Sequence, residues 1–254
     1  MVISPADLDS YRQAGHVTIA DVFSTAEMDA AVADAVAWAD AFVAGLDADE
    51  RQWYLEETSA GVAAVRKLDN PHHHRPEFRR LAADRRLLDI VERIIGKGVT
   101  VYFSQIFFKP PHGGGPKPVH QDNFYFGPAD LDGLITVWIA LDEATVKNGC
   151  LQFADGSHRG PVLAHEAPPE SPFNLQVPAA AANGYQMRPA PVPKGGISLH
   201  HGTTLHQSSD NRSGDWRRAC ALHYVRNDNP FVSPALAYDH DMALTVSGRP
   251  AGSN

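Results

Sequence analysis

The sequence is poor in cysteine, has no long apolar run and carries no excess of basic residues. Its 254 residues include only Cys150 and Cys220, far apart, which excludes a disulfide-rich scaffold and a CxxC zinc or redox motif. Asp and Glu number 30 against 22 Lys and Arg, so we expect no binding of nucleic acid through phosphates. With no stretch of about 18 apolar residues and no apolar signal core, we expect a cytoplasmic protein without a membrane span.

The composition is otherwise that of a globular protein. Hydrophobic residues make up 43% and charged residues 20%, values that exclude global disorder. The length suits one large domain, and no linker divides residues 1–254. The unusual feature is the 13 histidines, several of which lie near carboxylates or aromatic residues.

Residues 1–98 are predicted to be mostly helical. Ser24 and Glu27 have the spacing of a capping box, which begins an Ala-rich helix to Phe42, and a second amphipathic helix is predicted over Leu81–Ile95. From residue 99 to 226 the pattern favours strands, rich in β-branched and aromatic residues and separated by Gly, Pro, Asn and Asp. The predicted strands are 99–110, 134–141, 150–154, 196–200 and 218–225, which indicates an antiparallel sandwich or barrel.

Two segments are predicted to be irregular. Residues 162–193 are rich in Pro and Ala without a clear period, and we expect a long lid loop there. Residues 227–254 form an irregular C-terminal tail.

The strongest local motif is His120-Gln121-Asp122. Residues two apart lie on the same face of an extended strand, so this imidazole and carboxylate can converge on one metal ion. His206, beside a later predicted strand, supplies a third ligand. Two histidines and one carboxylate that leave open positions are typical of non-haem Fe(II) and O₂ chemistry.

A candidate carboxylate clamp follows His206. Arg217 stands at the beginning of a predicted strand, and Ser208 lies two residues after His206. An arginine fork binds a carboxylate through two hydrogen bonds, and a hydroxyl adds another. A metal with open positions beside such a clamp suits a small 2-oxo diacid that also chelates the metal.

The chain resembles the phytanoyl-CoA dioxygenase family of Fe(II)/2-oxoglutarate oxygenases. Five blocks carry the resemblance, in the family's order and spacing: FFKPP at 107–111, HQDNFYF at 120–126, Trp138, KNGCLQFADGSHRG at 147–160 and HQSSDNRSGDWRRA at 206–219. The resemblance covers most of the chain from about residue 67 to 224. It implies a mainly β fold, a double-stranded β-helix (jelly roll, cupin-like) with flanking N-terminal α-helices.

The resemblance also implies roles for individual residues. His120, Asp122 and His206 match the family's iron ligands, Arg217 matches the arginine that pairs with the distal carboxylate of 2-oxoglutarate, and Ser208, Trp138, Gln105 and Lys67 fall at the cosubstrate. Halogenases built on this fold replace the ligand carboxylate with Gly or Ala. Because Asp122 is present, the resemblance favours hydroxylation or a related oxidation.

Other histidines and aromatic residues are alternative candidates for metal ligands or substrate contacts. His72, His73 and His74 are interpreted as a solvated loop, because consecutive residues of a regular element cannot all face one ion. His201 is an alternative third ligand, but its spacing to Arg217 departs from the family, and we interpret it as a packed or supporting residue. Candidate substrate contacts are Phe107, Asn123, Tyr125 and His158, with plain sheet core or a turn-stabilising role as the alternative.

The expected function is therefore oxidation of a C–H bond in a small molecule, with Fe(II), 2-oxoglutarate and O₂ as cofactor and cosubstrates. By analogy with compact family members, we expect a substrate of secondary metabolism, such as antibiotic biosynthesis. Two alternatives stay open: a cupin-type metal enzyme that does not use 2-oxoglutarate, and a non-catalytic relative that binds the same ligands. The sequence does not indicate substrate identity, oligomeric state or the choice among hydroxylation, desaturation, cyclisation and epimerisation.

Overall fold

The fold is built on two facing antiparallel sheets with helices against the outer side of the larger one. The computed structural model describes residues 3–57, 61, 63–168 and 174–248. The helices are α1 (Pro5–Ala14), α2 (Thr25–Gly45), α3 (Ala48–Tyr54), α4 (Pro71–His74), α5 (Pro76–Ala82), α6 (Arg85–Ile95), α7 (Asp122–Phe126) and α8 (Ala179–Ala182). None of the described helices combines the length and the apolar composition that a bilayer crossing requires.

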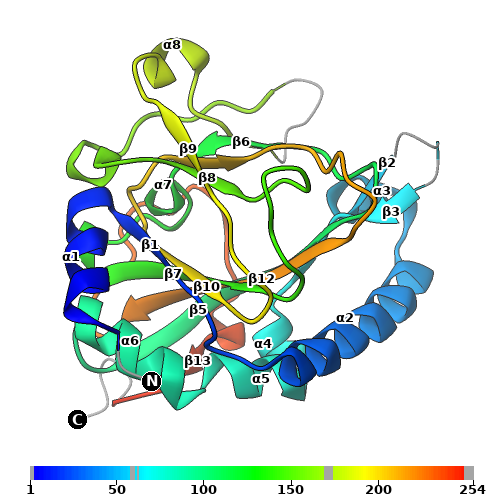
Figure 1. Ribbon diagram of the computed structural model, residues 1–254, viewed down its shortest axis with the longest axis horizontal. Coiled ribbons are helices and arrows are strands. Elements are labelled where there is room, and N and C mark those ends of the chain that lie inside the picture. Colours follow the sequence, from blue (N-terminus) through cyan, green and yellow to red (C-terminus); the bar gives the residue numbers. More distant parts are fainter. Residues whose placement is uncertain (1–2, 58–60, 62, 169–173, 249–254) are drawn as a thin grey trace.

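Two main sheets and one small hairpin contain the strands. The larger sheet has seven strands: β1 (His16–Ile19), β10 (Ile197–His201), β7 (Leu134–Ala140), β12 (Arg217–Arg226), β5 (Val99–Lys109) and β13 (Leu244–Thr245), with β4 (Lys67–Asp69) also paired to β5. The smaller sheet has the order β6 (Lys117–His120), β11 (His206–Ser208), β8 (Leu151–Ala154), β9 (Met187–Ala190). A separate hairpin joins β2 (Leu55–Glu57) and β3 (Ala63–Val65). Figure 1 shows the smaller sheet above the larger one, with α5 and α6 below.

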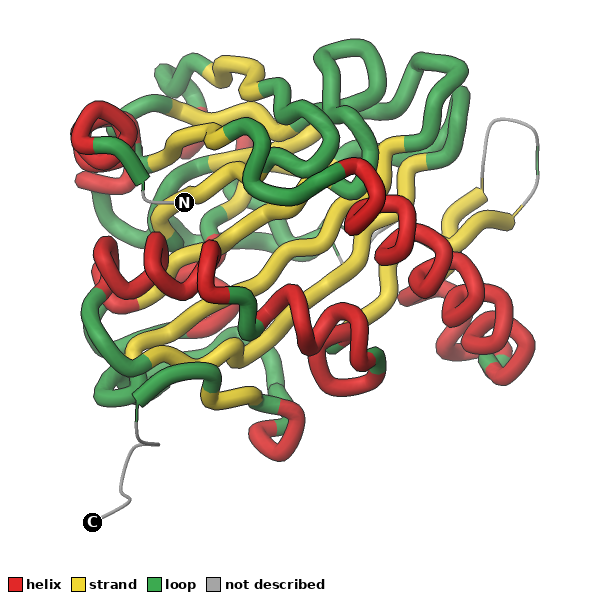
Figure 2. Tube along the Cα trace, turned by 60° about the horizontal axis from the view of Figure 1, so that its bottom comes forward, coloured by secondary structure: helices red, strands yellow, loops and turns green. Residues whose placement is uncertain are grey.

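The alternation of side chains along the central strands separates core from cavity. On β12, Cys220, Leu222 and Tyr224 belong to the hydrophobic core, whereas Ala221 and His223 line a cavity on the opposite face. The strands β5 and β7 alternate in the same way. The core thus lies between the larger sheet and the helices that Figure 2 shows across its face, and the other face is available for chemistry.

One predicted helix cap is present, and a second, unpredicted cap divides a predicted helix into two. Ser24 and Glu27 form the predicted capping box of α2. The single helix predicted over Leu81–Ile95 is wrong, because Ala83 leaves the helical path and the Asp84 carboxylate accepts a hydrogen bond from the backbone N–H of Arg86. The chain therefore ends α5 and begins α6 within this segment.

Several segments contain more regular structure than the sequence predicted. Within the N-terminal 98 residues, β4 pairs with β5 of the larger sheet. Within 162–193, of which 169–173 lie outside the described residues, Met187–Ala190 forms β9 and pairs with β8, so the loop is shorter than predicted. In the tail, β13 pairs with β5. Short strands of two to four residues carry too little alternation to be read from sequence.

The interpretation of the histidine triplet as a solvated loop is wrong for its first member. His72 is fully buried in the short helix α4. Its Nδ1 lies 2.6 Å from Ser104 Oγ, and its Nε2 donates to the carbonyl oxygen of Met242 at 2.8 Å. Burial lowers the pKa of His72 to about 4, so it is a neutral link between β5 and the C-terminal segment.

Candidate metal centre and active site

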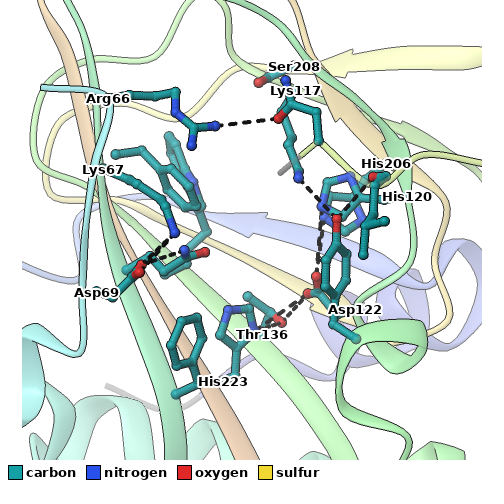
Figure 3. Close-up of a pocket in the computed structure, with 18 of the residues that line it drawn as sticks. Arg66, Lys67, Asp69, Lys117, His120, Asp122, Thr136, His206, Ser208 and His223 are labelled. Carbon is teal, nitrogen blue, oxygen red and sulfur yellow. Dashed lines mark hydrogen bonds and ion pairs between the residues drawn. The ribbon is translucent and has the colours of Figure 1, made fainter. Parts of the chain in front are cut away.

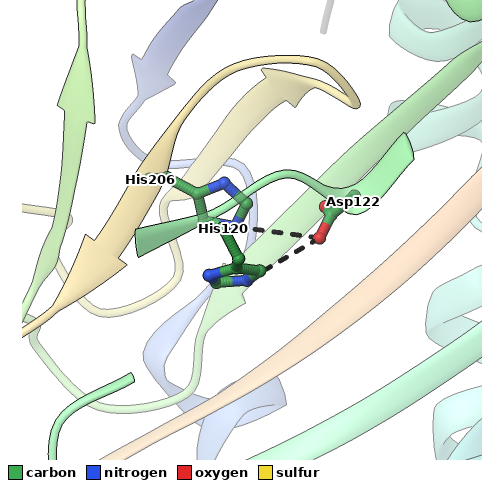
Figure 4. Close-up of side chains that lie close together, drawn as sticks. All are labelled: His120, Asp122 and His206. Atoms are coloured by element: carbon green, nitrogen blue, oxygen red, sulfur yellow. Dashed lines mark ion pairs between the residues drawn. The ribbon is translucent and has the colours of Figure 1, made fainter. Parts of the chain in front are cut away.

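The structure brings His120, Asp122 and His206 together where the two sheets face each other. His120 ends β6, His206 begins β11, and the two residues are paired directly across these antiparallel strands. The ligand atoms of the three side chains all lie within 4.8 Å of one another, and all three residues are buried (Figure 4). Asp122 Oδ1 is 3.9 Å from His120 Nε2 and 3.8 Å from His206 Nε2.

The local reason for this convergence differs from the predicted one. Asp122 does not continue the strand of His120; it is the first residue of the helix α7, with Gln121 as its N-cap. The side chains that face the cavity from α7 are Asp122, Tyr125 and Phe126, which is helical spacing. The expectation that Asp122 continues an extended strand is therefore wrong.

Hydrogen bonds fix which imidazole nitrogens face the centre of the cluster. His120 Nδ1 donates to the carbonyl oxygen of Pro118 at 2.8 Å, and His206 Nδ1 donates to that of Thr204 at 2.9 Å. A carbonyl oxygen only accepts, so each Nδ1 carries the proton and each Nε2 keeps its lone pair. Burial, together with His206, lowers the pKa of His120 well below its usual range, which keeps it in the neutral, ligating form.

The Asp122 carboxylate is held in one orientation. Its Oδ2 accepts from Thr136 Oγ1 at 2.5 Å and from His200 Nε2 at 3.1 Å, while Oδ1 points toward the two ligand histidines. His223 Nδ1 donates to Thr136 Oγ1 at 2.8 Å, because the threonine's own proton goes to the carboxylate. Burial alone would raise the pKa of Asp122, but the surrounding imidazoles hold it well below its usual range.

A buried pair of cations lies at the far end of the same cavity. Arg217 begins β12, is 2% exposed, and has its guanidinium 5.5 Å from the ring centroid of Trp138. Lys109 ends β5 directly opposite Arg217 in the strand register. The Lys109 ammonium donates to Ser208 Oγ at 3.0 Å and to the carbonyl oxygen of Ser209 at 2.5 Å.

This pair has the properties of an anion site. In the described part of the chain, no carboxylate lies within ion-pair distance of Arg217 or Lys109, and Arg217 Nε has no hydrogen-bond partner. Burial lowers the pKa of Arg217 to about 10, and burial plus the charge of Arg217 lowers that of Lys109 well below its usual range. Glu56 attracts both cations from beyond ion-pair distance, so the cost of burying two like charges is only partly offset, and a dianionic ligand would offset it further.

Other predicted residues form the opposite wall. Lys67 Nζ lies 2.8 Å from Asp69 Oδ2, and Gln105 Nε2 donates to Asp69 Oδ1 at 2.7 Å. Figure 3 shows Lys67 and Asp69 across the cavity from the metal cluster. Phe107 and Tyr125 also line this cavity, which has a volume of about 380 Å³.

Two predicted substrate contacts lie elsewhere. Asn123 is buried, and its Nδ2 donates to the carbonyl oxygen of Leu131 at 3.0 Å and to Thr203 Oγ1 at 2.7 Å, so it fixes a loop. The His158 ring packs beside His201, with ring centroids 5.6 Å apart, and neither Asn123 nor His158 lines the cavity. His201 is packed as predicted, with Nε2 3.0 Å from Asp132 Oδ1.

Sequence reasoning missed several cavity residues. No sequence motif predicts a place in the site for Arg66, Lys109, Lys117 or Thr136. The available signal for Lys109 was a lysine at the end of an otherwise apolar strand before Pro110. The other positions carry no local pattern, because they converge only through strand pairing.

Comparison with known proteins agrees with this geometry. Residues 11–219 match the family model described as phytanoyl-CoA dioxygenase. The chain belongs to the phytanoyl-CoA dioxygenase family. It is 29% identical over 245 residues to a Stutzerimonas stutzeri protein named "Probable alpha-ketoglutarate-dependent hypophosphite dioxygenase", covering 94% of this chain and 84% of that protein. A mouse phytanoyl-CoA dioxygenase domain-containing protein 1 is 32% identical over 64% of this chain, which spans only 57% of its length.

Solved structures show the same fold. The alpha-ketoglutarate-dependent carbocyclase SnoK from nogalamycin biosynthesis has a TM-score of 0.76 at 24% identity, covering 96% of this chain and 97% of its own. EctD from S. alaskensis with bound Fe has a TM-score of 0.74 at 24% identity, covering 98% and 85%. The predictions of the family, the jelly-roll fold and a dioxygenase of the iron and 2-oxoglutarate class are confirmed.

Proposed function

We propose that this family member oxidises a C–H bond of a small molecule, by hydroxylation, with Fe(II) held by His120, Asp122 and His206. The observation that carries the proposal is the buried three-ligand cluster at one end of a cavity whose other end holds two cations without a carboxylate partner in the described residues. Two neutral imidazoles and one carboxylate are a donor set that suits Fe(II) and leaves coordination positions open.

The second part of the proposal assigns the cosubstrate. Arg217, Lys109 and Ser208 bind the distal carboxylate of 2-oxoglutarate, and Trp138 packs against the arginine. The two positive charges match one end of a dianion, and the serine hydroxyl adds a hydrogen bond. We place Lys67 and Gln105 in the wall beside this cosubstrate, oriented by Asp69. When bound, iron and 2-oxoglutarate supply the activation of O₂, with succinate and CO₂ as products.

The remaining side chains orient and shield the site. Thr136 and His200 occupy Oδ2 of Asp122, which leaves Oδ1 directed at the two histidines. The aromatic rings of Phe107, Tyr125 and Phe126 line the cavity and keep bulk water from the reacting atoms. Because the ligand carboxylate is Asp122 rather than a small residue, hydroxylation is favoured over halogenation.

For the substrate we propose a small organic molecule of secondary metabolism. SnoK, which shares the fold, is named for nogalamycin biosynthesis, and its similarity to this chain supports the proposal. Hypophosphite, which appears in the name of the Stutzerimonas relative, is the second candidate, favoured by alignment over 94% of this chain.

The test is spectroscopic. Fe(II) and 2-oxoglutarate are added without oxygen, and we expect the weak visible metal-to-ligand charge-transfer band of the chelated keto acid. The variant Arg217→Met should weaken the band at limiting 2-oxoglutarate, whereas Arg212→Met, an exposed control nearby in the chain, should not.

Each alternative has its own outcome. Bound iron without the band at saturating 2-oxoglutarate would favour a cupin-type enzyme that does not use this cosubstrate. Failure to bind iron at all would refute the proposed metal centre. A normal band with no succinate formed beyond the uncoupled background, across a mass-spectrometric screen of both substrate classes, would favour the non-catalytic relative that binds the same ligands.

A further inference from the structure

A second group of positive charges lines the cavity, apart from the proposed 2-oxoglutarate clamp. It comprises Arg66, between β3 and β4, Lys67 at the beginning of β4, and Lys117 at the beginning of β6. Figure 3 shows Arg66 and Lys67 on one wall and Lys117 on the other, next to the metal cluster. Lys67 was assigned to the cosubstrate, but no sequence motif includes Arg66 or Lys117, and the proposed reaction does not use them.

Lys117 is directed toward the metal centre by an aromatic neighbour. Its ammonium donates to Tyr125 Oη at 3.1 Å and lies 5.3 Å from the centroid of the Tyr125 ring. The same ring is 5.8 Å from that of His120, and the tyrosine hydroxyl donates to the carbonyl oxygen of Leu175 at 3.0 Å. Among the described residues, no carboxylate lies within ion-pair distance of Lys117, so two of its three N–H groups remain available to a ligand.

The side chains opposite Lys117 are held by neighbouring groups. Asp69 pairs with Lys67 at 2.8 Å. The Arg66 guanidinium donates to the carbonyl oxygen of Trp53 at 2.6 Å and to Asn174 Oδ1 at 3.5 Å. Glu56 also lines this part of the cavity and attracts Arg66, and burial raises the pKa of the Glu56 carboxyl.

The three positive side chains of this group repel one another. Burial, followed by the charges of Arg66 and Lys67, lowers the pKa of Lys117 to about 7. Cations this close in a partly enclosed cavity are stabilised when an anion lies between them.

We infer that Lys117 and Arg66 bind an oxyanion of the substrate, a carboxylate or a phosphorus oxyanion, beside the metal centre. This inference rests on the proposed function and names its substrate class. Lys117 donates to Tyr125, whose ring lies 5.8 Å from that of His120, and both Lys117 and His120 line the cavity, so an anion held there brings the adjacent part of the substrate to the metal. Phe103, Phe126 and Tyr238, which pack together at the same cavity, offer an apolar surface for the remainder.

The experiment uses three probes of similar shape. Phenylacetate, benzylphosphonate and the neutral benzyl alcohol are titrated calorimetrically into the full-length protein with Fe(II) and saturating 2-oxoglutarate, without oxygen. We expect both acids to bind at least about tenfold more tightly than the alcohol, and their ratio distinguishes a carboxylate site from a phosphonate site. Loss of one charged hydrogen-bond donor should weaken acid binding roughly tenfold to a hundredfold in Lys117→Met and in Arg66→Met.

Controls separate this site from a general loss of structure. Lys117→Arg should recover most of the acid affinity, and the exposed control Lys147→Met should match the wild type. Binding of benzyl alcohol and the charge-transfer band should stay unchanged in Lys117→Met. Wild-type acid affinity in Lys117→Met, with that band intact, would overturn the inference.

The failure of the proposed function gives a different result. If the wild type shows no charge-transfer band, the titrations are repeated without metal or 2-oxoglutarate. Acid binding that is lost in Lys117→Met and kept in Arg217→Met would still support the anion site. Acid binding that is lost only in Arg217→Met would place the anion at the clamp and overturn the inference.

Discussion

Replacement of Lys109 by methionine should separate stability from cosubstrate binding. Lys109 is 6% exposed and lies opposite Arg217 in the pairing of β5 with β12, without a carboxylate at ion-pair distance in the described residues. The variant loses hydrogen bonds to Ser208 and Ser209, but it also removes a buried charge that Arg217 repels. Because these effects oppose each other, we expect the free energy of unfolding without ligand to change by no more than about 1 kcal/mol.

The affinity for 2-oxoglutarate should respond much more strongly. Removal of a charged donor from a carboxylate costs about 1.5–3 kcal/mol, which is roughly a 10- to 150-fold increase in Kd. Urea unfolding with and without 2-oxoglutarate, together with titration of the charge-transfer band, measures both quantities. The exposed control Lys147→Met should change neither.

The pH dependence provides a further check on the same variant. The folded-state pKa of Lys109 lies well below that of the unfolded chain, so between the two values the unfolded state binds more protons. Stability without ligand should therefore rise with pH through this window, and Lys109→Met should lack that part of the rise. Unchanged 2-oxoglutarate affinity, or a loss of more than about 3 kcal/mol of stability without ligand, would refute this reasoning.

Three further changes test other parts of the structure. Thr136→Val should weaken iron affinity about tenfold by releasing Asp122 Oδ2, measured by competition with a chelator; unchanged affinity would contradict the orienting role. His158→Ala should leave the KM of any identified substrate unchanged, because this ring lies outside the cavity. A large increase in KM would show that His158 contacts the substrate. Tyr224→Phe should cost about 1–2 kcal/mol in urea unfolding, because it leaves the buried carbonyl oxygen of Ala82 without its 2.9 Å hydrogen bond; a neutral effect would show that water replaces it.

The sequence was most informative where candidate functional residues lie close together in short motifs. His120 and Asp122 are separated by one residue, and Ser208 and Arg217 follow His206 closely, so their types and spacing predicted the family and the candidate ligands. The strand-based geometry behind that prediction was nevertheless wrong, since Asp122 begins a helix. The two side chains still lie close together, because a one-residue separation keeps them close in either conformation.

The tertiary structure decided which distant charges face one another. Lys109 meets Arg217 because β5 pairs with β12 in one register, and Thr136, His200 and His223 reach Asp122 from three different strands. The same pairing left His158 and Asn123 outside the cavity, although both lie in the motif blocks.

A register is set by the packing of whole sheet faces rather than by any one strand, and a shift of one residue would reverse every side chain. For this reason the sequence by itself determined the family, the fold class and the residue types of the candidate metal centre. The Lys109 and Arg217 pair exists only through the pairing of β5 with β12, and the support of Asp122 and the Lys117 and Arg66 group exist only once the two sheets face each other.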